Sequence, residues 1–177
     1  MATGDDLLDA YAALVRQWAP RINLVAPGDL ERFSERHIED SLKALPLVEE
    51  APEGPAIDVG SGAGLPGIPL AIADPRRPWR LLEPRAKRAA FLEEVARELG
   101  LDVEVVRLTA EQAANDRMFA AAHAVATARA LAPPEEAAAL LRPLLASGGI
   151  GILFVGAGAE LSAGAVAGVP GLAIIGP

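Results

Sequence analysis

Apolar residues recur at helical spacing along the first fifty residues of the chain. The apolar positions from 7 to 18 repeat every three or four residues, which predicts an amphipathic helix. The segment Pro27-Gly28-Asp29 is typical of a turn, and it offers Asp29 as the N-cap of a second helical region over residues 30–47. This region is expected to be either one helix or two short ones. The pattern therefore predicts a helical cap over residues 1–50.

From residue 55 onward, short apolar runs of strand length alternate with helical stretches. We expect strands over residues 56–59, 79–83, 103–106, 124–127 and 149–155, with a further short strand over residues 172–175. We expect helices over residues 66–73, 86–99 and 134–141. Alternating strands and helices predict an α/β fold with a mainly parallel, doubly wound sheet. The 177 residues suit a single domain, in which a Rossmann-like core over residues 55–177 carries the helical cap.

The composition excludes some classes of function. The chain has no cysteine, so disulfides, thiolate metal sites and cysteine nucleophiles are ruled out. It has no apolar run of about 18 residues and no basic N-terminal segment, so we expect a cytoplasmic protein with no membrane partner. A net charge of −8 argues against strong binding to bare nucleic acid. Basic residues nevertheless gather around the second expected strand, as a solvated face or a local phosphate contact: Arg76, Arg77, Arg80, Arg85, Lys87 and Arg88.

The first expected strand runs directly into a cluster of glycines. The stretch reads Asp58-Val59-Gly60-Ser61-Gly62-Ala63-Gly64-Leu65-Pro66-Gly67, with Pro66 suited to the first turn of the following helix. Glycines let a ligand approach the backbone closely, and the helix N-terminus offers free N–H groups. Gly62, Gly64 and Gly67 fit the dinucleotide spacing, but an acid two residues before G-x-G-x-G resembles motif I of the S-adenosylmethionine-dependent methyltransferases. The spacing favours a methyltransferase over an oxidoreductase, and a glycine-rich loop without a ligand is the remaining alternative.

Ligands of a doubly wound sheet bind at the carboxyl ends of its strands. Glu83 ends the second expected strand nineteen residues after Gly64, where a carboxylate suits the hydroxyls of a bound ribose. Arg129 follows the fourth expected strand, where the alternative is a salt bridge across the sheet end. Residues 108–111 are expected to form a loop that could flank an adenine, whereas His123 matches no motif. These positions define one edge of the sheet as the candidate binding site.

Four segments together resemble the RsmG (GidB) family of bacterial 16S rRNA (guanine-N7) methyltransferases. They are Trp18…Arg21-Ile22-Asn23-Leu24, Arg36-His37-Ile38-Glu39-Asp40-Ser41, residues 58–70 and Glu83…Lys87-Arg88…Phe91-Leu92. The resemblance covers residues 10–155 approximately. It implies a class I S-adenosylmethionine-dependent methyltransferase fold, S-adenosyl-L-methionine as the cofactor, and a guanine of 16S rRNA in the small ribosomal subunit as the acceptor. Transfer to guanine N7 needs no general base, because this nitrogen carries a lone pair and no proton.

The resemblance also implies roles for individual residues. The cofactor-binding residues would be Asp58, Gly60, Gly62, Gly64, Leu65, Glu83, Ala110, Glu111 and Arg129. Arg129, His37 and Arg36 would act on the substrate side as catalytic or site-shaping groups. A structural role beside Asp40 is the alternative for His37. No metal is implied, and we expect a monomer.

The chain departs from the family pattern in three places. Val155 stands where the family usually has a lysine, and Ala124 stands where an acid often opens the fourth strand. The C-terminus is shortened and rich in Gly and Ala, where the family completes further strands. We therefore expect normal cofactor binding but slow methyl transfer. The alternative functions are a weak or inactive cofactor-binding homologue that serves as an interaction module, and a methyltransferase of small molecules.

Overall fold

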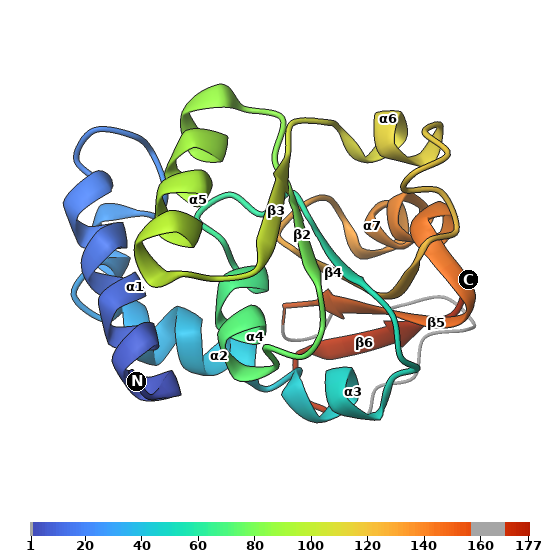
Figure 1. Cartoon of the computed structure of the whole chain (residues 1–177), viewed down its shortest axis with the longest axis horizontal. Helices are drawn as coiled ribbons and strands as arrows, with labels where there is room; N and C mark the ends of the chain where they lie inside the picture. The colour runs from blue at the N-terminus through green and yellow to red at the C-terminus, as the bar shows by residue number, and fades with distance from the viewer. Residues whose placement is uncertain (1, 157–168) are drawn as a thin grey trace.

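The computed structural model of the chain describes residues 2–156 and 169–177. Its centre is a six-stranded sheet in the order β3-β2-β1-β4-β5-β6 (Figure 1). The strands are β1 (Ala56–Val59), β2 (Trp79–Leu82), β3 (Val103–Val106), β4 (His123–Arg129), β5 (Leu145–Phe154) and β6 (Leu172–Ile175). β1 to β5 are parallel, and β6 pairs antiparallel with β5. The predicted mainly parallel, doubly wound sheet is confirmed, although β4 and β5 are longer than expected.

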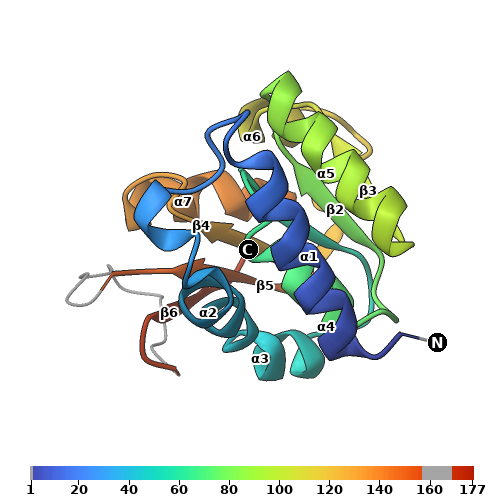
Figure 2. The same ribbon diagram turned by 90° about the vertical axis from the view of Figure 1, so that its left-hand side faces the viewer.

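Helices cover both faces of this sheet (Figure 2). On one face lie α1 (Gly4–Trp18), α4 (Gly67–Ala73) and α5 (Ala86–Leu99), and α1 packs against both of the others. On the other face lie α6 (Ala110–Ala114) and α7 (Pro134–Leu141). The shorter helices are η1 (Pro27–Asp29), η2 (Ser34–Ile38), α2 (Glu39–Leu42), α3 (Leu45–Glu50) and η3 (Arg142–Leu144).

The strand pleat divides the apolar core between the two faces. Ile57 and Val59 of β1 point into the core that α6 and α7 cover, and Leu82 of β2 joins them. Leu81, the neighbour of Leu82 along the strand, points the other way into the core under α1, α4 and α5. Successive residues of a strand face opposite sides, so strands buried on both faces read as continuous apolar runs. This burial on both faces explains why the residues of β1 and β2 are mostly apolar in the sequence.

Local sequence explains the start of α1 and the end of α5. The hydroxyl of Thr3 accepts the backbone N–H of Asp6, and the Asp6 carboxylate accepts the N–H of Thr3, so the two residues form a capping box at the start of α1. Gly100 ends α5 with φ +62°, a left-handed conformation that glycine adopts without strain. The helices predicted over residues 86–99 and 134–141 are confirmed at both ends.

For the helical region predicted over residues 30–47, the alternative of two short helical stretches is confirmed, one over residues 34–42 and one that begins at residue 45. The chain there divides into the π-helix η2 and the short helices α2 and α3. Pro46 lies in the first turn of α3, where a missing N–H is tolerated; in a longer helix it would break the hydrogen-bond ladder. Asp29 does not cap a helix. It belongs to η1, and its carboxylate accepts a hydrogen bond of 2.6 Å from Arg36.

Two further local expectations are corrected. α4 begins at Gly67 rather than at Pro66, which is the N-cap residue and follows a cis peptide bond. Residues 108–111 do not form a loop throughout, because the hydroxyl of Thr109 caps α6, which begins at Ala110. Most of the Gly- and Ala-rich C-terminal segment, residues 157–168, lies outside the described residues, while the expected strand over residues 172–175 is confirmed as β6.

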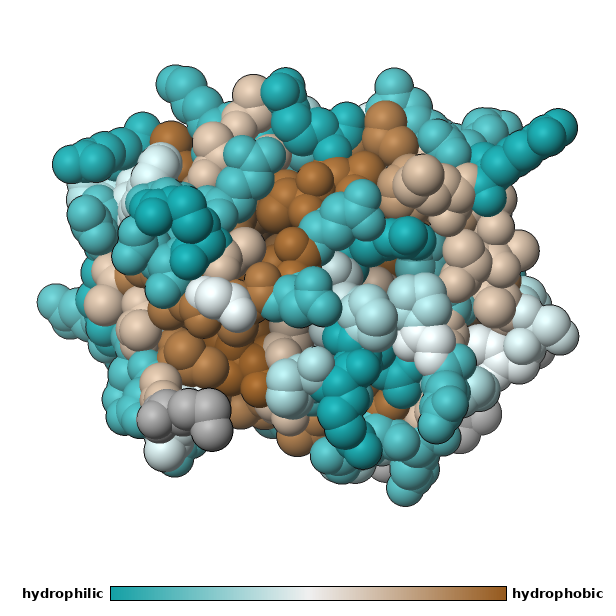
Figure 3. Space-filling view, viewed as in Figure 1, coloured by the Kyte–Doolittle hydropathy of each residue, from teal (hydrophilic) through white to brown (hydrophobic). Residues whose placement is uncertain are grey.

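The edge strand β3 is the most apolar part of the surface that Figure 3 presents, together with the end of α5. Leu99, Leu101, Val103 and Val105 are only partly buried there. Strand edges of this kind are protected by their shortness and by charged side chains, and Glu104 of β3 pairs with an arginine of β2. Within the described residues, none of the helices has the length and apolar character needed to cross a membrane.

Candidate active site

The register of the sheet brings three predicted site residues to one edge. Val59, the last residue of β1, pairs with the residues of β2 and β4 that immediately precede Glu83 and Arg129. Gly60 follows Val59, and its N–H donates to the carbonyl of Leu82 at 2.8 Å. Gly60, Glu83 and Arg129 therefore stand at the carboxyl ends of three adjacent parallel strands, which is where doubly wound sheets bind ligands.

The glycine loop owes its shape to residues without side chains. Gly60 and Gly62 have φ angles of +72° and +58°, which strain any residue with a Cβ. At Gly64 a Cβ would lie 2.6 Å from a neighbouring side chain, so this glycine permits close packing. The loop is also held from above, because the hydroxyl of Tyr11 in α1 donates to the carbonyl of Ala63 at 2.8 Å. The helical cap thus fixes the position of the loop.

Asp58 lies beneath the loop and is fully buried. Its Oδ1 accepts a hydrogen bond of 2.7 Å from the hydroxyl of Thr127 in β4, and its Oδ2 accepts the N–H of Gly67 at 3.3 Å. Burial is the main cause that raises the pKa of Asp58 to about 6, against which these hydrogen bonds act only partly. The structure therefore gives the Asp58 side chain a positioning role, joining β1, β4 and the start of α4.

Glu83 stands beside the loop and has 3% of its surface exposed. Its Oε2 accepts the N–H of Gly62 at 3.0 Å, and its Oε1 accepts the N–H of Arg85 at 2.9 Å. A carboxylate oxygen has two lone pairs, so each of these oxygens retains the capacity to accept one more hydrogen bond. The Glu83 carboxylate, which the sequence predicts to bind a ribose, is therefore hydrogen-bonded directly to the glycine loop.

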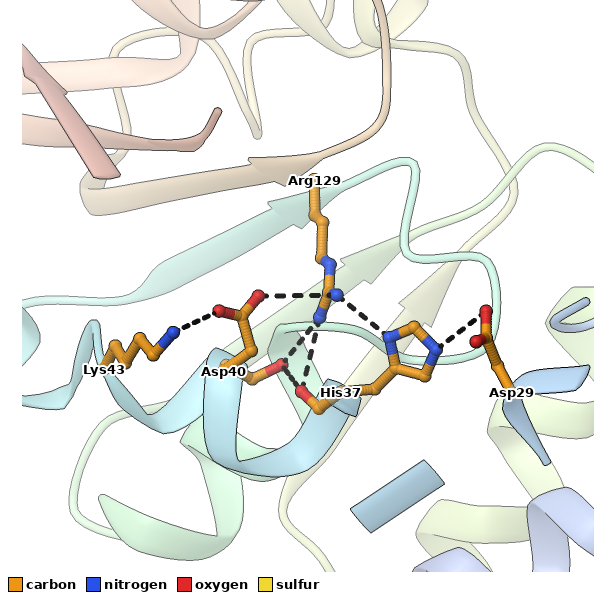
Figure 4. A network of polar contacts seen from close by, with 6 residues as sticks. Asp29, His37, Asp40, Lys43 and Arg129 are labelled. Carbon is orange, nitrogen blue, oxygen red and sulfur yellow. Dashed lines mark hydrogen bonds and ion pairs between the residues drawn. The ribbon is translucent and has the colours of Figure 1, made fainter. Parts of the chain in front are cut away.

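Arg129 is the centre of a polar network between β4 and the helical cap (Figure 4). Its Nη2 lies 2.9 Å from Nδ1 of His37 and 3.4 Å from Oδ2 of Asp40. Its Nη1 donates to the backbone carbonyl of His37 at 3.3 Å. Asp40 also pairs with Lys43 at 2.7 Å, and Asp29 lies 3.5 Å from Nε2 of His37 on the far side of the ring. The salt bridge that the sequence offered as the alternative role of Arg129 is present, and it joins the end of β4 to α2.

The His37 ring acts as a neutral acceptor in this network. Burial first, and then the positive charge of Arg129, lower the pKa of His37 below its ordinary value of 6.5. A neutral ring whose Nδ1 accepts from Arg129 carries its proton on Nε2, which faces Asp29 without an aligned hydrogen bond. The neutral ring of His37 therefore orients the guanidinium of Arg129 and places no second positive charge beside it.

A pocket of about 390 Å³ opens beside Arg129, within the range of volumes that small-ligand sites have. It lies at the carboxyl ends of β4 and β5, and Val155 is part of its wall. The other described lining residues are Asp40, Lys43, Arg129, Ala130, Ala132, Pro134, Phe154, Gly156, Pro170 and Gly171. Of the charged lining groups, Asp40 and Lys43 come from the helical cap and Arg129 from β4, while the remaining lining residues are apolar or glycine.

Comparison with known proteins decides the family. The family profile for GidB, rRNA small subunit methyltransferase G, matches residues 5–163. The chain belongs to this family. It is 42% identical over 158 residues to Ribosomal RNA small subunit methyltransferase G of Granulibacter bethesdensis, covering 89% of this chain and 70% of the relative. It is also 42% identical over 157 residues to the protein of that name from Acidiphilium cryptum, covering 86% and 69%.

Solved structures show the same fold. A protein of Corynebacterium glutamicum is 20% identical and superposes with a TM-score of 0.60 over 82% of this chain and 66% of its own. A precorrin-6y C5,15-methyltransferase of Geobacter metallireducens is 16% identical, with a TM-score of 0.53 over 74% of this chain and 63% of its own. The Rossmann-like class I methyltransferase fold predicted for this GidB family chain is confirmed.

Other predicted site residues lie farther from the centre of the site. Arg36 is exposed, and its ion pair with Asp29 connects it to the Arg129 network. Ala110 and Glu111 form the first turn of α6, and no hydrogen bond or ion pair between described residues joins them to the glycine loop. Leu65 is buried in the core under the helical cap.

Two residues that contribute to the site, Tyr11 and Thr127, were not singled out from the sequence. Asp40 was considered as a neighbour of His37, which it follows by three residues on one side of a helical segment, but its contact with Arg129 was not predicted. Tyr11 looked like an ordinary core position of α1, and its hydroxyl gave no sign of a partner 52 residues away. Thr127 sits within a buried strand, where threonine is common for its β-propensity alone.

The cluster of basic residues around β2 is divided in the structure. Arg76 and Arg77 precede the strand and both contact Asp74, at the edge opposite the glycine loop. Arg80 lies in the middle of the strand and pairs with Glu104 at 3.0 Å. Only the remaining members, Arg85, Lys87 and Arg88, lie at the carboxyl end of β2, around the start of α5.

Proposed function

We propose that this chain transfers a methyl group from S-adenosyl-L-methionine to N7 of a guanine in the 16S rRNA of the small ribosomal subunit. One observation carries the proposal: the glycine loop with Glu83 and the pocket beside Arg129 share one edge of a methyltransferase sheet. The family relatives with 42% identity bear the name Ribosomal RNA small subunit methyltransferase G, which supports the choice of acceptor.

The chemistry of the loop and Glu83 fits S-adenosyl-L-methionine, whose sulfonium centre supplies the methyl group. Gly62 presents bare backbone with no non-neighbouring atom of the described residues closer than 3.7 Å to the position of a Cβ, so a ligand can approach it, whereas the corresponding space at Gly60 is filled by the side chain of Leu131. The Glu83 carboxylate would accept hydrogen bonds from the ribose hydroxyls with its remaining lone pairs. Arg129 would offer its guanidinium to the carboxylate of the cofactor or to the acceptor. Asp58 contributes by holding the loop rather than by contact.

The proposed reaction asks the chain for positioning and not for a proton transfer. Guanine N7 attacks with its own lone pair, so the neutral ring of His37 has no proton to remove. The rate would come from aligning N7 with the methyl carbon and from excluding water, and such alignment can supply about 7–11 kcal/mol of a barrier. The network of Arg129, His37 and Asp40 makes this side of the pocket rigid, which suits that task.

Val155 favours the alternative of a weak enzyme or an interaction module. Val155 lies in the wall of the pocket, and a lysine ammonium at this position could donate to guanine O6 or to a phosphate. Valine offers packing alone. We therefore propose normal cofactor binding and slow transfer. We further propose that the chain acts as a monomer in the cytoplasm on small subunits that are already assembled, because its net charge of −8 opposes binding to bare RNA.

The proposal is tested with labelled S-adenosyl-L-methionine and small subunits from cells that lack the endogenous enzyme. Label should appear in the rRNA with this chain and should fall sharply with Glu83→Ala, while the exposed Glu93→Ala serves as the matched control. Incorporation that is equal in the presence and absence of the chain, under conditions where calorimetry shows cofactor binding, would favour the interaction module instead.

A further inference from the structure

A second pocket, of about 450 Å³, lies on the other side of the glycine loop and is strongly basic. Its lining combines the link after α1 with the first turn of α5: Arg21, Ile22, Asn23, Arg85, Ala86, Lys87 and Arg88. Four of these seven residues carry a positive charge and none carries a negative one. In a chain with a net charge of −8, this separation of charge singles the pocket out.

Arg88 joins the two segments that form the pocket. Its Nη2 and Nε donate to the backbone carbonyl of Asn23 at 2.7 and 3.2 Å, across 65 residues of sequence. Both bonds leave the guanidinium charge unneutralised, because the acceptor is a carbonyl and not a carboxylate. The pocket therefore has a fixed cationic floor rather than a set of independent surface side chains.

The other three cations are available to a ligand. Arg21, Arg85 and Lys87 are exposed, and their side chains make no hydrogen bond or ion pair within the described part of the chain. Arg32 and Arg97 are held by neighbouring glutamates, whereas Arg117 and Arg142 are single exposed cations without such a partner among the described residues. The pocket differs from both cases because it gathers four cations around one cavity, and this arrangement suits an external anion.

The pocket adjoins the proposed cofactor site. Arg88 Nη1 lies 3.8 Å from the position that a Cβ on Gly62 would occupy, and the N–H of Arg85 donates to Glu83. α5 spans 14 residues and begins here without a side-chain cap, so the positive end of its dipole adds to the field of the arginines. An anion in the pocket would lie next to the glycine loop, on the side away from the Arg129 pocket.

We propose that this pocket binds phosphate groups of the rRNA strand that carries the target guanine. The inference rests on the proposed function and adds a second contact to it, which holds the RNA backbone while the base enters the pocket beside Arg129. Phosphate contacts set the register of a nucleic acid without reading its sequence, and arginine and lysine are the side chains that make them. A local basic pocket also explains how an acidic protein can dock on a folded ribonucleoprotein surface.

The test compares two double variants that lose the same charge. Arg21→Gln with Lys87→Gln removes two cations from the pocket. Arg117→Gln with Arg142→Gln removes two exposed cations from the segments before β4 and β5, at the opposite edge of the sheet. The side chains of this control pair likewise make no hydrogen bond or ion pair among the described residues. Each protein is titrated against small ribosomal subunits that lack the modification, at several KCl concentrations, and separately against S-adenosyl-L-homocysteine by calorimetry.

We expect the slope of log affinity against log salt to fall by about 1.4 in the pocket variant, at about 0.7 for each lost contact with single-stranded RNA. The control variant should keep the slope of the parent chain, and all three proteins should bind S-adenosyl-L-homocysteine equally. Equal slopes in the pocket variant and the parent would overturn the inference, as would equal losses in both variants. Weaker cofactor binding with unchanged subunit binding would assign the pocket to the carboxylate of the cofactor. A parent chain that binds subunits through this pocket but transfers no methyl group would refute the proposed function and leave the phosphate site standing.

Discussion

Replacement of Asp58 by asparagine should change how the stability of the protein depends on pH. Asp58 is fully buried, and burial raises its pKa from 3.8 to about 6. Between these two values the unfolded chain releases the proton of Asp58 while the folded chain keeps it. Folding is therefore disfavoured progressively as the pH rises, and this contribution levels off above pH 6.

The size of the effect follows from the two pKa values. A difference of about 2.2 units corresponds to about 3 kcal/mol of stability lost over the whole titration, at 1.36 kcal/mol for each unit. About 2 kcal/mol of this loss should fall between pH 4.5 and 7.5. The loss is tolerated because the ionised carboxylate still holds Thr127 and the N–H of Gly67, and so maintains the loop.

The assay is urea unfolding at several pH values, followed by the fluorescence of the buried Trp79. The quantity of interest is the stability of the parent chain minus that of Asp58→Asn, since all other titrating groups are common to both. This difference should decrease by about 2 kcal/mol from pH 4.5 to 7.5. The exposed Asp102→Asn is the control and should give a flat difference. A flat difference for Asp58→Asn as well would show that the carboxyl titrates normally and would refute the reasoning.

Three further predictions concern the site. Glu83→Ala should weaken S-adenosyl-L-homocysteine binding by about 1.5–3 kcal/mol in calorimetry, because the ribose loses a charged acceptor and the N–H of Gly62 loses its partner. Equal affinity of the variant and the parent chain would show that Glu83 is not part of the site. Val155→Lys should raise methyl transfer to small subunits by roughly ten- to a hundredfold without tightening cofactor binding, and robust transfer that lysine does not improve would point to positioning by Arg129, His37 and Arg36. Assembled small subunits should be modified far better than protein-free 16S rRNA, which a rate comparison at fixed salt would check; efficient modification of bare rRNA would contradict the argument from net charge.

Much of the fold follows from patterns that act over short distances. The strands β1 and β3 and the helices α5 and α7 have the predicted bounds, because apolar periodicity, Pro134 and Gly100 act locally. The sequence did not decide between one helix and two short ones in the region from residue 30 to 47, since its bends depend on packing against α4 and on the position of Pro46. Strand lengths were also underestimated where β4 and β5 continue through contacts with each other.

The site divides in the same way. The glycine loop and Glu83 follow from the order of elements in the chain, because the carboxyl ends of adjacent parallel strands must meet. The sequence also places Arg129 at this edge, but its contacts with His37 and Asp40 join segments about 90 residues apart and require the three-dimensional arrangement. Arg76 and Arg77 contact Asp74 and lie outside the basic pocket, although they stand close to Arg85 in the sequence, whereas the distant Arg21 belongs to the pocket.

The most direct test of the account is to identify the product of the reaction. Small subunits from cells without the endogenous enzyme are incubated with this chain and isotopically labelled S-adenosyl-L-methionine, and the rRNA is digested to nucleosides for mass spectrometry. The account predicts labelled 7-methylguanosine from 16S rRNA. Label in any other nucleoside, or no label from a chain that binds the cofactor, would contradict it.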